Sequence, residues 1–160
     1  MAEVVLPLTI RDLTRDDPPA CAWTGSPEQN FAAALDRADR GEIDYLVVCP
    51  PSGLPVAVGG IDYTLSAAAG TLYQLAVHGA LHSCGIGTLL IGAAEQRIGA
   101  RGLHRAELAV EQNNPRARAL YGRLGYLAYG SRPEEWDEQA GDGSITRYRT
   151  MCTLMRKELG

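Results

Sequence analysis

The residues most suited to chemistry lie in Leu75–Thr88, where an apolar run is followed by a polar turn and two glycines. Gly85 and Gly87 stand directly before an amphipathic segment that is typical of a helix. The first N–H groups of a helix have no internal partner, and the helix dipole makes that end mildly positive. Because glycine lets a ligand approach the backbone closely, this segment predicts a site for phosphate oxygens.

Two familiar glycine motifs do not account for the segment. A P-loop requires Lys after its second glycine, and here Thr88 follows Gly87. The dinucleotide fingerprint requires Gly or Ala where this chain has Leu90. Close packing of a helix on a strand would also explain a Gly-x-Gly pair. The glycines alone therefore leave function and packing equally open.

A second motif follows downstream, in a stretch that has the pattern of a strand, a turn and a helix and ends in Gly125-Tyr126. Together the two motifs resemble the GNAT superfamily of acyl-CoA-dependent N-acetyltransferases. His82–Gly87 stands where that family has Gln/Arg-x-x-Gly-x-Gly/Ala. The resemblance covers residues 72–126, and two motifs in order, about 30 residues apart, are more specific than either one alone. The second signature, Asn-x-x-Ala-x-x-Leu-Tyr-x-x-x-Gly-Phe/Tyr, is matched by Asn114, Ala117, Leu120, Tyr121, Gly125 and Tyr126.

The resemblance implies how acetyl-CoA, the acyl donor, would bind. The pantetheine arm would pair like an added strand with the backbone of residues 75–77, and an N–H near Val77 would face the thioester oxygen. The pyrophosphate would lie on the N–H groups of residues 83–88. Asn114 would contact the pantetheine amide, cap the following helix, or do both. The coenzyme-binding residues so implied are Leu75, Ala76, Val77, His82, Ser83, Cys84, Gly85, Ile86, Gly87, Thr88, Asn114, Ala117 and Tyr121.

Three positions near the glycines require separate interpretation. His82 replaces the family's Gln or Arg and carries a charge only when protonated, so a weaker phosphate contact and an incidental surface histidine are equally open. Gly79 stands where the family often has proline, which should loosen the turn. The expected contribution of Cys84 is its backbone N–H, because no general-base partner stands beside its thiol.

The resemblance makes Tyr121 the principal catalytic candidate, because a phenol stays protonated at neutral pH and can donate a proton to the departing thiolate. The alternative is an aromatic residue that packs in the core. No general base is evident, since Ala109 stands where some family members have Glu. Strand alternation puts Glu107 and Glu111 on the face of Ala109, and either could act directly or through water. Further candidates are Asp62, Tyr63, Tyr73 and His78.

The hydrophobic pattern and the resemblance together predict one domain over residues 1–160. Its expected fold class is α/β (α+β), with a mixed, mostly antiparallel sheet of about six or seven strands flanked by helices. The acidic segment 132–143, which contains Trp136, is expected to form a loop at the acceptor pocket, where Trp136 either receives a cation or packs on the body of the protein. Strands are predicted over 4–11, 43–49, 56–65, 72–77, 103–110, 127–130 and 145–156, and helices over 27–40, 86–98 and 115–124.

Composition narrows the class of protein. The net charge of −4 argues against a general nucleic-acid-binding surface. No apolar stretch is long enough for a membrane span and no secretion signal is evident, so a cytoplasmic location is expected. The four cysteines are scattered, which favours free thiols over a zinc site or disulfides, and no metal is expected.

These observations lead to a functional hypothesis. The chain is expected to move an acetyl group from acetyl-CoA to a primary amine by direct attack through a tetrahedral intermediate. The acceptor, a small molecule or a peptide, cannot be identified from the sequence, because one fold serves many substrates. The alternative is a non-catalytic acyl-CoA-binding or regulatory module. The resemblance is compatible with a homodimer.

Overall fold

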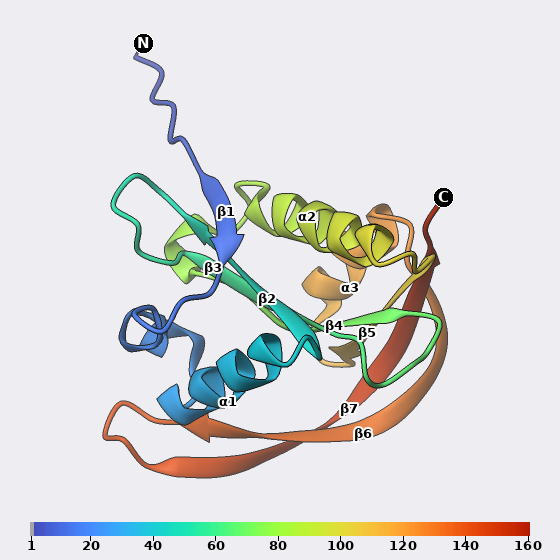
Figure 1. The fold of residues 1–160 in the computed structure, drawn as a ribbon. Coiled ribbons are helices and arrows are strands. Elements are labelled where there is room, and N and C mark those ends of the chain that lie inside the picture. The colour runs from blue at the N-terminus through green and yellow to red at the C-terminus, as the bar shows by residue number, and fades with distance from the viewer. Residues whose placement is uncertain (1) are drawn as a thin grey trace.

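The structure is a computed structural model that describes residues 2–160, and a seven-stranded sheet forms its centre (Figure 1). α2 and α3 cover one face of this sheet, and α1 with the short helix η1 covers the other. In chain order the elements are β1 (Thr9–Asp12), η1 (Pro18–Thr24), α1 (Glu28–Asp39), β2 (Ile43–Cys49), β3 (Ala57–Asp62), β4 (Gly70–Val77), η2 (Gly79–Leu81), α2 (Ile86–Ala100), β5 (Arg105–Glu111), α3 (Pro115–Arg123), β6 (Leu127–Gln139) and β7 (Ile145–Glu158).

The strand order is β1-β2-β3-β4-β5-β7-β6, and every neighbouring pair is antiparallel except β4 and β5. The parallel pair is joined by the α2 crossover, as parallel strands require. It is also short, because only Gly70–Leu72 pairs with Ala106–Leu108. Beyond this short stretch, β4 and β5 do not pair with each other, so the sheet is open between them.

Two hydrophobic clusters hold the layers together. Leu90 and Ile98 of α2 are buried against the sheet, and Phe31 of α1 packs edge-on against Tyr45 on the other face. The amphipathic segment predicted after the glycines is confirmed, because α2 buries one face, which includes Ile86, Leu90, Ala94 and Ile98. The fold class expected from the sequence is therefore confirmed as a mixed, mostly antiparallel sheet flanked by helices. Among residues 2–160, no helix is long and apolar enough to cross a lipid bilayer.

Two predictions of local structure were wrong. The expected strand 4–11 covers only Thr9–Asp12, and Val4 is 89% exposed, so its apolar character did not indicate burial. The expected loop 132–143 is mostly strand, because β6 continues from the predicted 127–130 to Gln139. Ion pairs with β7 stabilise this polar extension, in which Glu135 lies opposite Arg149 and Asp137 opposite Arg147.

Ile98 gives a direct test of the packing between α2 and the sheet. Its side chain is 0% exposed, and Ile98→Ala should lower the free energy of unfolding by about 3 kcal/mol through lost burial and a residual cavity. Leu89→Ala is the matched control on the same helix, because Leu89 is 45% exposed and its truncation should cost less than about 1 kcal/mol. Urea unfolding of both variants measures the difference, and equal losses would contradict this packing.

Candidate functional site

A β-bulge shapes β4 where it parts from β5. The register with β3 shifts between Val58 and Gly60, and Gln74 adopts φ 52°, a left-handed conformation that side chains seldom take. The Tyr45 hydroxyl donates a hydrogen bond of 2.9 Å to Gln74 Oε1. Burial raises the pKa of Tyr45 well above its usual value, so the phenol remains a donor. Tyr45 therefore holds the bulge from the α1 side of the sheet.

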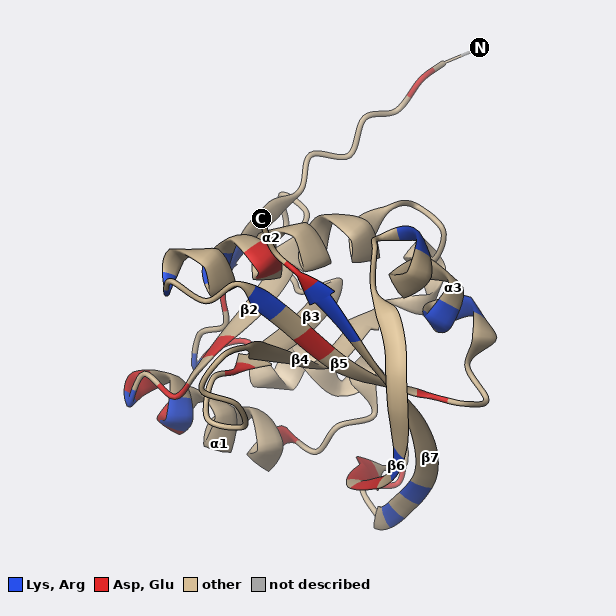
Figure 2. Cartoon of the chain, turned by 90° about the vertical axis from the view of Figure 1, so that its right-hand side faces the viewer, with Lys and Arg blue, Asp and Glu red and all other residues tan. Residues whose placement is uncertain are grey.

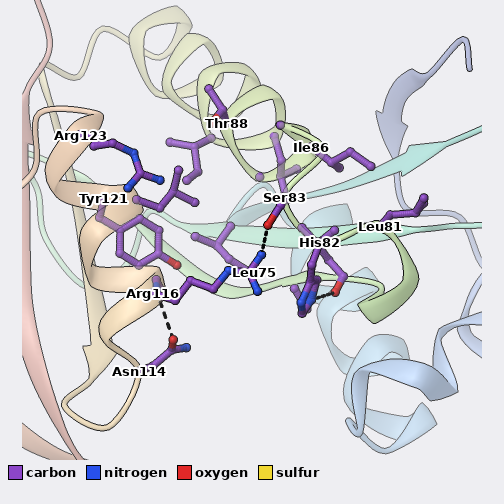
Figure 3. A pocket seen from close by; sticks show the side chains of 18 residues that line it. Leu75, Leu81, His82, Ser83, Ile86, Thr88, Asn114, Arg116, Tyr121 and Arg123 are labelled. Atoms are coloured by element: carbon purple, nitrogen blue, oxygen red, sulfur yellow. Dashed lines mark hydrogen bonds between the residues drawn. The ribbon is translucent and has the colours of Figure 1, made fainter. Parts of the chain in front are cut away.

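A cavity of about 470 Å³ lies on the α2–α3 side of this opening (Figure 3). Its walls come from the end of β4, the turn before α2, and the face of α3 that looks toward that turn. The residues that line it are Leu75, Ala76, Val77, Leu81, His82, Ser83, Gly85, Ile86, Gly87, Thr88, Leu90, Ile91, Asn114, Arg116, Ala117, Leu120, Tyr121 and Arg123.

The turn before α2 presents backbone N–H groups to this cavity. Ser83 and Gly85 have φ values of 64° and 81°, and no side chain caps the helix. The first N–H groups of α2 are therefore left for a ligand. Arg116 of α3 donates to Ser83 Oγ, and Arg123 lines the same cavity. Two guanidinium groups thus add to the positive end of the α2 dipole, an arrangement that suits phosphate oxygens.

His82 contacts the strand backbone. Its Nε2 lies 2.9 Å from Val77 O, and because a carbonyl oxygen only accepts, the ring nitrogen donates. The N–H of His78 donates to the carbonyl oxygen of Val56, just before β3. Because backbone groups of successive strand residues point to alternate sides, the N–H and C=O of Val77 point away from β3 and toward the opening. His82 therefore connects the turn to the last residue of β4.

A second cavity, of about 640 Å³, lies between α1, the sheet and the β6–β7 hairpin. Its lining includes Tyr45 and Gln74 as well as residues of β5 and β6. The two cavities share a border at the opening between β4 and β5. The residues that line both are Leu75, Ala76, Asn114, Ala117 and Tyr121.

Tyr121 occupies this shared border. Its side chain is half-buried and packs edge-on against Tyr126. Burial alone shifts its pKa. Burial raises the pKa of Tyr121 to about 12, so the phenol keeps its proton at neutral pH. Asn114 caps α3 by accepting a bond of 3.1 Å from the Ala117 N–H, and it also borders both cavities.

The structure gathers most of the predicted site residues and separates a few. Every implied coenzyme-binding residue lines the first cavity except Cys84, whose side chain is exposed. Glu111 lines the second cavity and accepts a bond of 2.6 Å from the Tyr148 hydroxyl. Glu107 lines neither cavity and lies 3.9 Å from Arg105.

The remaining candidates for a general base divide in the same way. Asp62 and Tyr73 line the second cavity. Tyr63 lines neither cavity and donates to Asp44 at 2.6 Å, while His78 accepts from the Ala80 N–H. No group of three or more His, Cys, Asp or Glu side chains within residues 2–160 is placed to hold a metal ion.

Sequence reasoning missed the two arginines of α3 and the tyrosines that support the site. Arg116, Leu120 and Arg123 have the spacing of one helix face, and this pattern could have indicated that both charges face the glycine turn. Tyr45 and Tyr148 had no such signal, because their partners Gln74 and Glu111 are distant in the sequence.

Comparisons with known proteins agree with this geometry. The model of the acetyltransferase (GNAT) family matches residues 8–126, so the chain belongs to this family. A search of curated proteins finds no match.

Solved structures share the fold. The ribosomal-protein-S18-alanine N-acetyltransferase of Escherichia coli is 22% identical, with a TM-score of 0.73 over 96% of this chain and 95% of that one. The PaiA N-acetyltransferase of Thermoplasma acidophilum, in complex with coenzyme A, is 14% identical, with a TM-score of 0.73 over 96% and 99%. A GNAT-family acetyltransferase of Streptococcus pneumoniae is 20% identical, with a TM-score of 0.71 over 96% and 100%.

The hydrogen bond that holds the bulge can be tested by removing one oxygen atom. Tyr45→Phe should lower the free energy of unfolding by about 1 kcal/mol, because Gln74 Oε1 loses its donor. Tyr73→Phe removes a neighbouring hydroxyl that forms no hydrogen bond with residues 2–160, and it should change stability little. Denaturant unfolding distinguishes the two variants, and an equal effect would show that the bulge does not depend on Tyr45.

Proposed function

We propose that this protein transfers an acetyl group from acetyl-CoA to the primary amine of an acceptor. The observation that carries the proposal is that two cavities meet at Tyr121, in the opening between β4 and β5. The first cavity would hold the acyl donor and the second the amine. Membership of the acetyltransferase (GNAT) family and the fold shared with a coenzyme A complex support this assignment.

The residues of the first cavity suit the chemical parts of acetyl-CoA. The uncapped start of α2, with Arg116 and Arg123 across the cavity, suits the phosphates. The end of β4 pairs with β3 but not with β5, so its free edge offers backbone groups to the amides of the pantetheine arm, and Asn114 adds a side-chain amide. The N–H of Val77, directed into the opening, is the candidate donor to the thioester oxygen.

The proposed reaction assigns a role to a residue of each cavity. The neutral amine nitrogen attacks the thioester carbonyl carbon, a C–N bond forms, and the C–S bond breaks as the tetrahedral intermediate collapses. The amine proton passes to Glu111, directly or through water, and the sulfur leaves as a thiolate that takes a proton from solvent water. Tyr121 donates a hydrogen bond to that sulfur. With a pKa of about 12 the phenol is a weaker acid than a thiol, so it acts mainly by stabilising the thiolate.

A direct assay separates this function from that of a non-catalytic acyl-CoA-binding module. Calorimetry with acetyl-CoA, CoA, ATP and NAD tests the first cavity, and thiol release with a panel of primary amines tests the second. Selective binding of acetyl-CoA with amine-dependent thiol release is the expected result. Binding without thiol release from any amine would favour the binding module, and preference for ATP or NAD would overturn both.

Tyr121→Phe tests the role of the phenol. We expect kcat to fall about a hundredfold, the lower range for loss of a hydrogen bond to a charge that develops in the transition state, with little change in acetyl-CoA affinity. Tyr129→Phe is the matched control, because Tyr129 is an exposed tyrosine that lines neither cavity. Unchanged kcat in the Tyr121 variant would leave Tyr121 with a packing role alone.

The pH dependence of kcat gives a second readout of Tyr121. The phenol is protonated below its pKa, and burial raises that pKa to about 12, so the proton-donating form persists to higher pH. We therefore expect no decline in kcat between about pH 8 and pH 10.5, where an ordinary tyrosine begins to ionise. A decline in that range that disappears in Tyr121→Phe would contradict the burial of the phenol.

Arg116 and Arg123 can be tested against a third arginine on the same helix. Arg116→Gln and Arg123→Gln should each raise the Kd for acetyl-CoA about fivefold, a modest loss because both side chains are exposed. The loss should shrink in high salt, which screens exposed charges. Arg118→Gln removes the same charge from a side chain outside the cavity and should have little effect. Equal effects on the Kd at all three positions would indicate that the net charge of α3, and not contacts in the cavity, attracts acetyl-CoA.

A further inference from the structure

Two carboxylates that line the second cavity form no ion pair within residues 2–160. Six carboxylates line this cavity, and four of them pair with arginines. Asp62 pairs with Arg37 at 3.0 Å and Glu134 with Arg132 at 2.7 Å. Among residues 2–160, Glu111 and Glu138 form no ion pair, and their recorded side-chain partners are Tyr148 and Trp136.

One wall of the cavity is formed by the β6–β7 arm, which we define as residues 132–149. Figure 2 shows acidic and basic residues together at the end of this arm. Strand alternation puts Glu134, Trp136 and Glu138 on one face, opposite Tyr148 of β7. On the other face Glu135 and Asp137 are neutralised by Arg147 and Arg149 at 2.9–3.0 Å. On the face of Trp136, Arg132 pairs with Glu134, and within residues 2–160 Glu138 is the acid of this face that forms no ion pair.

The arm is also fixed in position against the body of the protein. The N–H of Gln139 donates a bond of 2.7 Å to Gly25 O, in the loop before α1. In Figure 1 the arm sweeps beneath α1, so its inner face closes the second cavity. The carboxylates of Glu111 and Glu138 thus line a cavity from paired strands and not from a free loop, although Glu138 is itself exposed.

Two aromatic rings accompany the free carboxylates. Trp136 and Tyr148 have ring centroids 5.1 Å apart. Trp136 donates its Nε1–H to Glu138 at 3.2 Å, and the Tyr148 hydroxyl donates to Glu111 at 2.6 Å. Trp136 is half-buried and lines the cavity, and tryptophan is the best aromatic partner for a cation.

We infer that the acceptor is an amine that carries a second positive charge, held by Trp136 and Glu138. This inference rests on the proposed function. In that chemistry Glu111 accepts the proton of the reacting amine. Tyr148 contacts both Glu111 and Trp136, so the reacting amine and the second positive charge would be separated by about the length of one tyrosine side chain. A diamine with a spacer of about five carbons, or a peptide with a basic side chain near its free amine, has this pattern of charge.

Three acceptors of equal length test the inference on the unaltered protein. Pentylamine, 1,5-diaminopentane and 5-aminopentanoate present the same reacting amine with a neutral, positive or negative far end. With acetyl-CoA as donor, kcat/KM should be about tenfold higher for the diamine than for pentylamine, and lowest for the amino acid. Equal values for the first two would overturn the inference. No thiol release from any amine would instead count against the proposed function.

A pair of variants assigns the preference to the inner face. Glu138→Gln should remove most of the preference for the diamine over pentylamine. Glu135→Gln, the matched control on the same strand, should keep it, because that carboxylate pairs with Arg147 and Arg149 on the other face. An equal loss in both variants, or in neither, would overturn the assignment.

A short peptide with lysine beside its free N-terminus distinguishes the two sources of such a charge. A higher kcat/KM for this peptide than for the diamine would support a polypeptide acceptor. A lower value would support a small amine. In both cases a peptide with norleucine in place of lysine should react more slowly than the lysine peptide, and equal rates would contradict the inference.

Discussion

The separation of β4 from β5 is the constraint on which the rest of the site depends. A continuous sheet would place a wall between α1 and the pair α2–α3, and the two cavities could not meet. Here the parallel pairing stops after Leu72, and the bulge at Gln74 redirects the remainder of β4. The opening leaves the edge of residues 75–77 that faces away from β3 without a strand partner, and Tyr121 lines the cavities on both faces of the sheet. In this protein the site is therefore produced by an interruption of regular structure.

Local rules account for the parts of the site that were predictable from the sequence. The turn at residues 82–87 requires glycine because Gly85 has a positive φ, and Asn114 before Pro115 is a favourable helix start. These requirements act within a few residues, so they can be recognised without the fold. The proposed acyl-donor cavity also depends largely on backbone groups of β4 and of the turn before α2. The positions of these groups follow from the strand and the helix start.

The other parts depend on contacts between distant segments. Tyr45 and Gln74 are 29 residues apart, and Tyr148 and Glu111 are 37 apart. The extension of β6 could not be read from hydrophobic alternation, because charged cross-strand pairs stabilise it and apolar burial does not. The strand expected over 4–11 failed for the opposite reason, since apolar residues there are exposed. The hydrophobic pattern reports burial, and both segments lie outside the core.

The electrostatics of the two cavities oppose each other. Positive groups at the start of α2 and on α3 suit an anionic donor, whereas free carboxylates on β5 and the β6–β7 arm suit a cationic acceptor. Under the proposed function, this separation would let two substrates of opposite charge approach from opposite faces of the sheet. It also has a chemical cost, because carboxylates that attract an ammonium group stabilise its protonated form, and only the neutral amine can attack. A carboxylate close to the reacting nitrogen reduces this cost by accepting the proton, whereas one further away can only hold charge. The placement of Glu111 at the end of β5 and of Glu138 on the arm fits this division of roles.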